Sequence, residues 1–276
     1  MSEPITFHID PVGLKNIQAI FCDIDGTLID SESRLHPETV AAVERIKDRI
    51  PFFLISGRNV KGMQAIYDTL GLNTPIVSMN GAFISLPNGK VLAKQPLEKD
   101  CAWAIVQEIT QNFPTVSLNF YTPDEWFSSP LETPYLQREI NILQMGPTVY
   151  KDVREVFVKN LIKMILLGDK EVLDRVYDSL TARFKDVTII HNSDHYIEVY
   201  STLADKGKAI DFLLEGLKLT GDQALCLGDA LIDLPMYDHC RYGVAVANAR
   251  PSVLKKANII TLSNNLLGVK HVLDLL

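Results

Sequence analysis

The chain has 276 residues, 47% of them hydrophobic, and a formal net charge of −7 at pH 7. This length and composition suffice for one large domain, or for a core with one inserted domain, and do not favour disorder. The acidic balance argues against nucleic acid or a membrane surface as a main partner, because both require a basic surface, whereas a small phosphorylated metabolite needs only local positive charge. With no leader pattern in Met1–Pro11 and no apolar run of about 18 residues, we expect a soluble, cytoplasmic protein.

The first chemically informative stretch begins at Ala19–Cys22, four mostly apolar residues that predict a buried strand. Two carboxylates, Asp23 and Asp25, follow this strand directly. In open α/β sheets ligands bind beyond the carboxyl ends of the strands, so these acids should mark a site. Because like charges this close repel each other, the pattern favours a hard divalent cation with oxygen ligands, such as Mg²⁺, between them.

Two other interpretations of this stretch are disfavoured. An Asp-Gly hairpin needs a second strand at once, whereas a polar segment and then a helical pattern follow. A calcium loop that begins Asp-x-Asp has Gly at its sixth position and Glu at its twelfth, where this chain has Leu28 and Arg34.

The alternation of helix and strand then continues. Pro37 and the apolar spacing after it predict a helix that ends near Ile50, and further patterns predict a strand at 52–55, a helix at 60–70 and a strand at 76–79. Such βαβ units have parallel strands whose carboxyl ends share one edge of the sheet. Asp23, Ser56 and Asn80 should therefore converge.

The pattern changes after this segment. Pro87-Asn88-Gly89 predicts a hairpin, and the following residues predict helices around Trp103 and over 172–180, with strands at 116–120, 164–167, 187–190 and 196–200. We expect an α+β domain inserted at 85–201. The side chains in this domain that could face a substrate are more simply explained by packing or surface exposure, so we assign no role to Tyr121, Trp126, Arg138 and His195.

The earlier pattern resumes from Leu203. Lys206 precedes a predicted helix, a strand at 224–227 ends at Gly228-Asp229, and a strand at 243–246 ends near Asn248. We therefore expect an α/β fold with a Rossmann-like parallel-sheet core, formed by residues 1–84 and 202–276, and an inserted α+β cap domain. The four cysteines are scattered and favour structural thiols over a disulfide or a zinc site.

Asp23-Ile24-Asp25-Gly26-Thr27 after an apolar strand resembles the signature of the haloacid dehalogenase superfamily of phosphatases and phosphomutases. Further short motifs recur in that family's order, so the resemblance covers nearly the whole chain: Ser56-Gly57-Arg58, Asn80-Gly81, Lys206-Gly207, and Gly228-Asp229 followed by Asp233. The chain is most similar to the Cof-type subfamily of small-molecule phosphatases, in which a large cap domain that determines substrate specificity is inserted into the core.

This resemblance implies a Mg²⁺-dependent phosphatase that hydrolyses a small phosphate monoester, with a sugar phosphate favoured, through an aspartyl-phosphate. Asp23 would be the nucleophile, and Asp25 would act as general acid and then general base. The metal ion would be held by Asp23, the Asp25 carbonyl and Asp229, with Asp233 assisting. If Asp229 begins a helical turn, the carboxylates of Asp229 and Asp233 lie on one face of it.

The resemblance also implies a phosphate clamp made by four groups: Lys206, Ser56 and the backbone N–H groups of Gly57 and Ile24. Weaker candidates for substrate contacts are Arg58, Asn80 and Asn248. The chain departs from the subfamily at Ile232, where the usual Asn contacts the phosphate and Ile cannot donate a hydrogen bond. The alternatives are then a weaker enzyme or a replacement donor, which Arg58 or Asn248 could supply.

Two rival functions fit the same motifs. A phosphomutase forms the same aspartyl-phosphate but shields it from water until the phosphoryl group is returned. A degraded homologue would bind a phosphorylated metabolite or a protein without catalysis, and the retained pair Asp23 and Asp25 argues against it.

Overall fold

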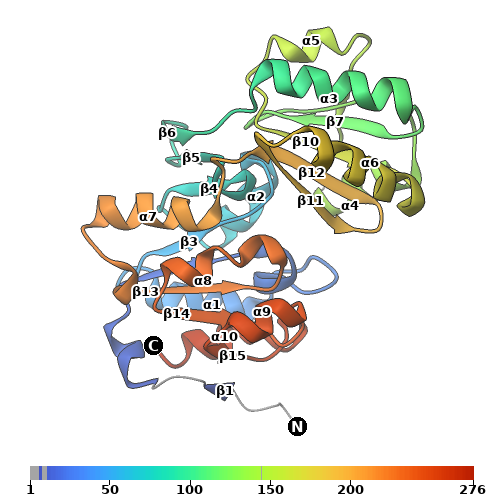
Figure 1. Ribbon diagram of the computed structural model, residues 1–276. Helices are drawn as coiled ribbons and strands as arrows, with labels where there is room; N and C mark the ends of the chain where they lie inside the picture. Colours follow the sequence, from blue (N-terminus) through green and yellow to red (C-terminus); the bar gives the residue numbers. More distant parts are fainter. Residues whose placement is uncertain (1–5, 8–10, 144) are drawn as a thin grey trace. The chain divides into compact units, whose positions relative to one another are not determined.

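The computed structural model describes residues 6–7, 11–143 and 145–276 (Figure 1). The sequence predicts no leader in Met1–Pro11. Most of this stretch lies outside the described residues. The chain forms two compact units. The core unit comprises the described part of Met1–Gly57 together with Met63–Leu92 and Asp205–Leu276, and the inserted unit comprises Arg58–Gly62 and Ala93–Ala204. The predicted boundaries at 84/85 and 201/202, and the role of the inserted unit in specificity, stay predictions.

The core unit is built on a six-stranded sheet with the order β1-β15-β14-β13-β2-β3. All neighbours in this sheet are parallel except β1, which runs antiparallel to β15. The strands are β1 (Thr6–Phe7), β2 (Ala19–Cys22), β3 (Phe52–Leu54), β13 (Ala224–Gly228), β14 (Tyr242–Ala245) and β15 (Ile259–Ile260). The central strands β2 and β13 are buried along their whole length, as continuous apolar runs predict. The predicted α/β class with a parallel-sheet core is therefore confirmed.

A smaller, three-stranded sheet is linked to the β3 edge of the core sheet. Strands β4 (Ile76–Ser78), β5 (Phe83–Ser85) and β6 (Val91–Lys94) form it in that order, and a parallel bridge between Ile55 and Val77 links it to the end of β3. The Leu86 N–H donates to the Lys90 carbonyl at 2.8 Å, which closes the predicted hairpin.

Five α-helices of the core unit are α1 (Pro37–Ile46), α7 (Lys206–Leu217), α8 (Met236–His239), α9 (Pro251–Lys256) and α10 (Gly268–Leu273). A sixth, α2 (Val60–Thr69), belongs to the core unit from Met63 onward. Helix α1 packs against α10, and α7 packs against α8 (Figure 1). Asp205 accepts a hydrogen bond from the Lys208 N–H at 2.9 Å and so caps α7. This cap fixes the start of α7, where Lys206 is the first helical residue.

The inserted unit contains a second six-stranded sheet, with the order β11-β12-β10-β7-β8-β9. Its neighbours are antiparallel except for the parallel pair β8 and β9. The strands are β7 (Ser117–Tyr121), β8 (Trp126–Ser128), β9 (Thr148–Val149), β10 (Lys163–Leu167), β11 (Val187–Ser193) and β12 (Tyr196–Ser201). The helices are α3 (Lys99–Asn112), α4 (Pro134–Leu143), α5 (Arg154–Phe157) and α6 (Lys170–Arg183). The sequence patterns did not predict β8, β9, α4 or α5.

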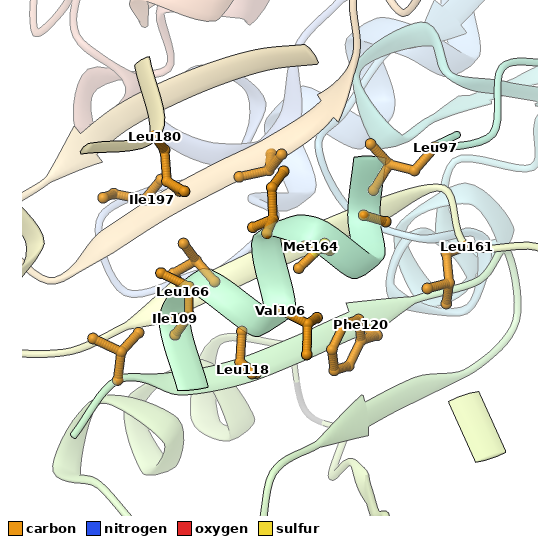
Figure 2. Packing of buried hydrophobic residues seen from close by; sticks show 14 of the residues in the cluster. Leu97, Val106, Ile109, Leu118, Phe120, Leu161, Met164, Leu166, Leu180 and Ile197 are labelled. Atoms are coloured by element: carbon orange, nitrogen blue, oxygen red, sulfur yellow. The ribbon is translucent and has the colours of Figure 1, made fainter. Parts of the chain in front are cut away.

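One face of this sheet packs against α3 and α6. Side chains alternate between the two faces of a strand, so every second residue of each central strand joins the core (Figure 2). The register places Met164 of β10 opposite Phe120 of β7, and Leu166 opposite Leu118. These residues pack with Val106 and Ile109 of α3, Leu180 of α6 and Ile197 of β12.

The aromatic residues left without a role in this unit are explained by packing. Tyr121 and Trp126 are buried and stack with their ring centroids 5.5 Å apart, and the Trp126 indole N–H donates to Asn119 Oδ1 at 3.0 Å. The His195 ring stacks on Tyr135 at 4.2 Å. In the part of the chain that the structure describes, no helix is both long and apolar enough to cross a bilayer.

A buried carboxylate anchors the loop between β2 and α1. The backbone N–H groups of Glu32 and Arg34 donate to Asp30 Oδ1, each at 2.9 Å, while Arg34 Nε and His36 Nε2 lie 2.8 and 3.0 Å from Asp30 Oδ2. Burial opposes the ionisation of Asp30, but the hydrogen bonds from Arg34 and Glu32 outweigh it and lower the pKa of Asp30 to about 2.

We predict that Asp30→Asn lowers the stability of the folded protein at neutral pH. Because the pKa of Asp30 in the folded chain lies below its ordinary value of 3.8, the stabilisation is present above that value and is lost as the pH falls toward 2. Urea-unfolding midpoints of wild type and variant, measured from about pH 7 to about pH 2, should converge at the acid end. Glu32→Gln is the control, because Glu32 is exposed and its pair with Arg34 should contribute little. A difference in midpoint that stays constant with pH would contradict this role of Asp30.

Candidate active site

The site lies at the carboxyl ends of β2 and β13. The Asp23 N–H donates to the Leu227 carbonyl at 3.0 Å, which continues the pairing of the two strands and holds Asp23 at their edge. Asp23 is 6% exposed, whereas Asp25 lies in the following tight turn, Ile24–Leu28, with its side chain exposed. The Asp23 carboxylate is therefore buried at the end of β2, whereas Asp25, in the turn that follows, is exposed to solvent.

Gly26 lets Asp229 approach this turn. Gly26 has φ +81°, and a Cβ at this position would lie 2.5 Å from Asp229 Oδ2. Thr27 Oγ1 donates to Asp229 Oδ1 at 3.1 Å. The Asp229 carboxylate is thus held against the turn that carries Asp25, at a distance that only glycine permits.

Lys206 is buried at the centre of the site, with 1% of its surface exposed. Its Nζ lies 2.5 Å from Asp23 Oδ1, 2.5 Å from Asp233 Oδ1 and 3.4 Å from the Ile55 carbonyl. An ammonium has three donors, and these three oxygens accept from it. Lys206 therefore connects the end of β2 with the end of β3 and with the loop after β13.

Asp233 reaches the site through the fold of its loop. The condition that Asp229 begins a helical turn is not met, because the 3₁₀ helix here is Leu231–Asp233. Asp233 Oδ2 instead accepts hydrogen bonds from the backbone N–H groups of Asp229 and Ala230, at 3.0 and 2.9 Å. Asp233 thus shapes the loop that carries Asp229 and also pairs with Lys206.

The electrostatics of this group are dominated by burial and crowding. Burial lowers the pKa of Lys206, but the charges of Asp23 and Asp233 outweigh it and raise this pKa, so the ammonium stays protonated. Burial and the charge of Asp233 raise the pKa of Asp23 well above its ordinary value. The same two causes raise the pKa of Asp229 to about 7. One ammonium does not balance the negative charge gathered here.

These residues fit a divalent cation. Oxygens of Asp23, Asp229 and Asp233 all lie within 4.8 Å of one another, and the Lys206 ammonium pairs with two of these carboxylates, Asp23 and Asp233. Three carboxylates and one ammonium leave a formal excess of two negative charges, which a divalent ion would offset. Carboxylate oxygens are also the ligands that Mg²⁺ prefers. The structure does not test the predicted part of the Asp25 carbonyl in this ligand set.

The loop after β3 joins the site through its backbone. The Ser56 N–H donates to the Val77 carbonyl at 3.0 Å, and the Asn80 N–H donates to the Ser56 carbonyl at 2.9 Å. Ser56 is 1% exposed, and Ile24 is also buried. With the contact between Lys206 and Ile55, these bonds bring the ends of β2, β3 and β4 together, as the parallel arrangement predicts. The phosphate-binding roles of Ile24, Ser56, Gly57 and Lys206 stay predictions.

Three further predicted residues have definite surroundings. Arg58 belongs to the inserted unit, where its guanidinium donates to the Gly62 carbonyl at 3.0 Å. Asn248 Nδ2 donates to the Gly26 carbonyl at 2.8 Å, and its Oδ1 accepts from the Asn264 N–H at 2.8 Å. Asn248 thus supports the turn after β2. Ile232 is only partly buried, in the loop between Asp229 and Asp233.

Sequence reasoning missed two supporting residues. Thr27 was quoted in the motif without a role, although its hydroxyl orients Asp229. Asn264 donates from Nδ2 to the Ile29 carbonyl at 2.9 Å and holds Asn248 through its backbone N–H. The polar pair Asn264-Asn265 between apolar segments is a turn signal that could have drawn attention to this position.

Comparisons with known proteins agree with this geometry. The chain matches the family of haloacid dehalogenase-like hydrolases over residues 20–273. The Bacillus subtilis protein YxeH is 30% identical over 268 residues, which cover 92% of this chain and 96% of YxeH. The HMP-PP phosphatase of an Enterobacter species is 26% identical over 234 residues, 84% of this chain and 85% of that protein. A crystal structure of a haloacid dehalogenase-like hydrolase from Bacteroides thetaiotaomicron is 25% identical, with a TM-score of 0.87, and covers 94% of this chain and 98% of that one.

The chain therefore belongs to the haloacid dehalogenase-like hydrolases, and the predicted resemblance to their Cof-type members is confirmed. Within that family it is a phosphatase, like the relatives named phosphatase YwpJ and HMP-PP phosphatase.

Ile232 is the departure from the subfamily pattern that can be tested at this site. We predict that Ile232→Asn raises the catalytic efficiency on the best small substrate by about 10-fold, because it adds a donor where loss of one typically costs more than that. Metal binding should be unchanged, since Asp229 and Asp233 are both kept. Leu231→Asn is the matched control, because Leu231 is an exposed apolar neighbour in the same loop. An unchanged or lower kcat/KM for Ile232→Asn would mean that another group already fills the role or that Ile232 is needed for packing.

Proposed function

We propose that this protein is a Mg²⁺-dependent phosphatase that hydrolyses a small phosphate monoester, of the sugar phosphate class, through a covalent aspartyl-phosphate on Asp23. The observation that carries this proposal is the buried contact between Lys206 and Asp23, with the Asp229 carboxylate close by. A carboxylate held beside an ammonium at the end of a strand is oriented for attack, because one oxygen is anchored and the direction of the other is thereby set.

The first half of the reaction transfers the phosphoryl group to the protein. An oxygen of Asp23 forms a bond to phosphorus as the bond to the ester oxygen breaks. Asp25 donates its proton to the leaving oxygen, which departs as the alcohol. The exposed position of Asp25 in the turn after Asp23 suits this step, since the leaving group must lie on the solvent side of the nucleophile.

The second half restores the enzyme. Asp25, now a carboxylate, takes a proton from water, and the resulting hydroxide attacks phosphorus and breaks its bond to Asp23. Inorganic phosphate leaves, and Asp25 again holds the proton that the next leaving group needs. One carboxylate therefore serves as acid and then as base.

Binding of the phosphoryl group requires positive charge and hydrogen-bond donors around its oxygens. Lys206, the Ser56 hydroxyl and the N–H groups of Gly57 and Ile24 are the proposed donors. A Mg²⁺ ion held by Asp23, Asp229 and the Asp25 carbonyl, with Asp233 assisting, would offset the negative charge that nucleophile and phosphoryl group share. The charge excess among these three clustered carboxylates supports this assignment.

The substrate class rests on the resemblance to small-molecule phosphatases and on relatives such as the HMP-PP phosphatase. The decisive experiment is a screen of phosphorylated metabolites with and without Mg²⁺, scored by release of inorganic phosphate. Hydrolysis of sugar phosphates that depends on Mg²⁺ supports the proposal. Hydrolysis that proceeds equally after removal of divalent ions would contradict it.

We predict that Asp23→Asn lowers turnover by about 10³-fold or more, because an amide cannot serve as the nucleophile. The fold should persist, since burial already disfavours the charged form of Asp23 and the amide is nearly isosteric. The measurement is phosphate release together with acid-quench trapping of the acyl-phosphate, which only wild type should form. Wild-type-like turnover by a variant whose mass is confirmed would remove the covalent mechanism.

Asp25→Asn should also lower turnover strongly, but for a different reason. The nucleophile remains, and only proton transfer is lost, so an aryl phosphate with a good leaving group should suffer less in the first step than a sugar phosphate. Single-turnover rates of acyl-phosphate formation with the two substrates make this comparison. Equal losses for both would show that Asp25 is not the general acid.

A further inference from the structure

Three consecutive residues after β4 have a left-handed backbone. Their φ angles are 52° at Met79, 59° at Asn80 and 88° at Gly81, and we call them the left-handed turn. Glycine adopts such angles freely and Asn tolerates them, but in Met the Cβ approaches the carbonyl oxygen too closely. A strained segment of this kind persists only where its surroundings hold it in place, and it is therefore a pointer to function.

The left-handed turn contacts the loop that contains Ser56 and Gly57. The Asn80 N–H donates to the Ser56 carbonyl at 2.9 Å, and the Asn80 side chain is buried. A Cβ built on Gly57 would lie 3.0 Å from Asn80 Oδ1, and the next two atoms that it would meet also belong to Asn80. The Asn80 amide thus lies directly on the backbone of Gly57.

The other end of the left-handed turn contacts the helix that carries Lys206. A Cβ on Gly81 would lie 2.6 Å from the Asp205 carbonyl oxygen and 3.1 Å from Ala209 Cβ. Asp205 is the cap of α7, directly before Lys206. The same three residues therefore touch the Ser56–Gly57 loop on one side and the first turn of α7 on the other.

We infer that the left-handed turn sets the position of the Ser56–Gly57 loop relative to Lys206, and that Asn80 is a positioning residue that acts through Gly57. This role differs from the substrate contact that the sequence predicts for Asn80. It rests on the proposed function only in that Ser56, Gly57 and Lys206 are taken to bind the phosphoryl group. Left-handed geometry aims the Asn80 amide at Gly57, and Gly57 lacks the Cβ that would push the amide away.

Asn80→Gly tests this inference, because glycine keeps the backbone angles but removes the amide. Lys218→Gly is the matched control: Lys218, the exposed C-cap of α7, has φ 59° and ψ 36°, against 59° and 33° for Asn80. Both substitutions relieve the same strain, so neither should lower the Tm appreciably. Only Asn80→Gly should weaken binding of inorganic phosphate with Mg²⁺, by about 10-fold in calorimetry, with a matching fall in kcat/KM.

A double substitution tests whether Asn80 acts through Gly57. Gly57→Ala places a methyl group against the Asn80 amide and should weaken phosphate binding by about 10-fold in the wild-type background. In the Asn80→Gly background the space is open, so the same change should cost less than about twofold. If Gly57→Ala weakens phosphate binding equally in both backgrounds, Asn80 does not act through Gly57, and the inference is overturned.

The outcomes also separate this inference from the proposed function. If wild type binds phosphate but hydrolyses no ester, the proposed function is refuted. The inference still holds in that case, provided that the coupling between positions 57 and 80 is observed. Asn80→Gly that binds phosphate as tightly as wild type refutes the inference and leaves the phosphatase mechanism intact. Wild type that binds no inorganic phosphate in the presence of Mg²⁺ counts against both.

Discussion

The site depends on a buried ammonium that is shared by two carboxylates. Lys206 is 1% exposed and lies 2.5 Å from both Asp23 and Asp233. Removing three charged groups from water costs free energy that their mutual attraction offsets only in good geometry, so such a cluster is weak evidence of stabilisation. Its presence at the ends of the strands is better explained by chemistry than by folding. The same cluster orients the proposed nucleophile and fixes the loop that carries Asp229.

Close approach of the backbone is the second constraint on this site. At Gly26 a side chain would collide with Asp229, and at Gly81 it would collide with Asp205. At both positions φ is positive, which glycine adopts at little cost. The loops at the edge of the sheet can therefore lie closer together than side chains would allow, and carboxylates and amides from different loops meet within hydrogen-bond distance of one another.

Sequence patterns predicted the core unit well, because its strands are continuous apolar runs that end abruptly in polar motifs. Asp23, Ser56 and Asn80 were placed together on that basis, whereas Asp229 and Lys206 were assigned to the same site by the family resemblance. The hydrogen bonds from Asp229 and Ala230 to Asp233 could not be foreseen, since they depend on how the loop folds back on itself. The support that Asn248 gives to Gly26 spans 222 positions in the sequence, and no local pattern reports such a contact.

The inserted unit was predicted less completely. Its central strands alternate between a face packed on α3 and α6 and an opposite face, and that alternation is visible in the sequence. Strand β9 has two residues, both exposed, and α5 has four residues, so neither is long enough to show a period. These short elements form because tertiary packing selects them, which propensity alone does not reveal.

The insertion also has a consequence for how the chain folds. The central strands β2 and β13 pair Ala19 with Ala224, so the middle of the core sheet joins two segments that are far apart along the chain. Apart from the short segment Arg58–Gly62, the inserted unit is one continuous stretch, Ala93–Ala204. Its strands pair with strands that are closer in the sequence than β2 and β13 are. Closing a long loop costs less entropy once the intervening residues are already compact. We therefore expect the inserted unit to become ordered first during synthesis, and the site formed by Asp23, Lys206 and Asp229 to assemble only when the C-terminal strands emerge.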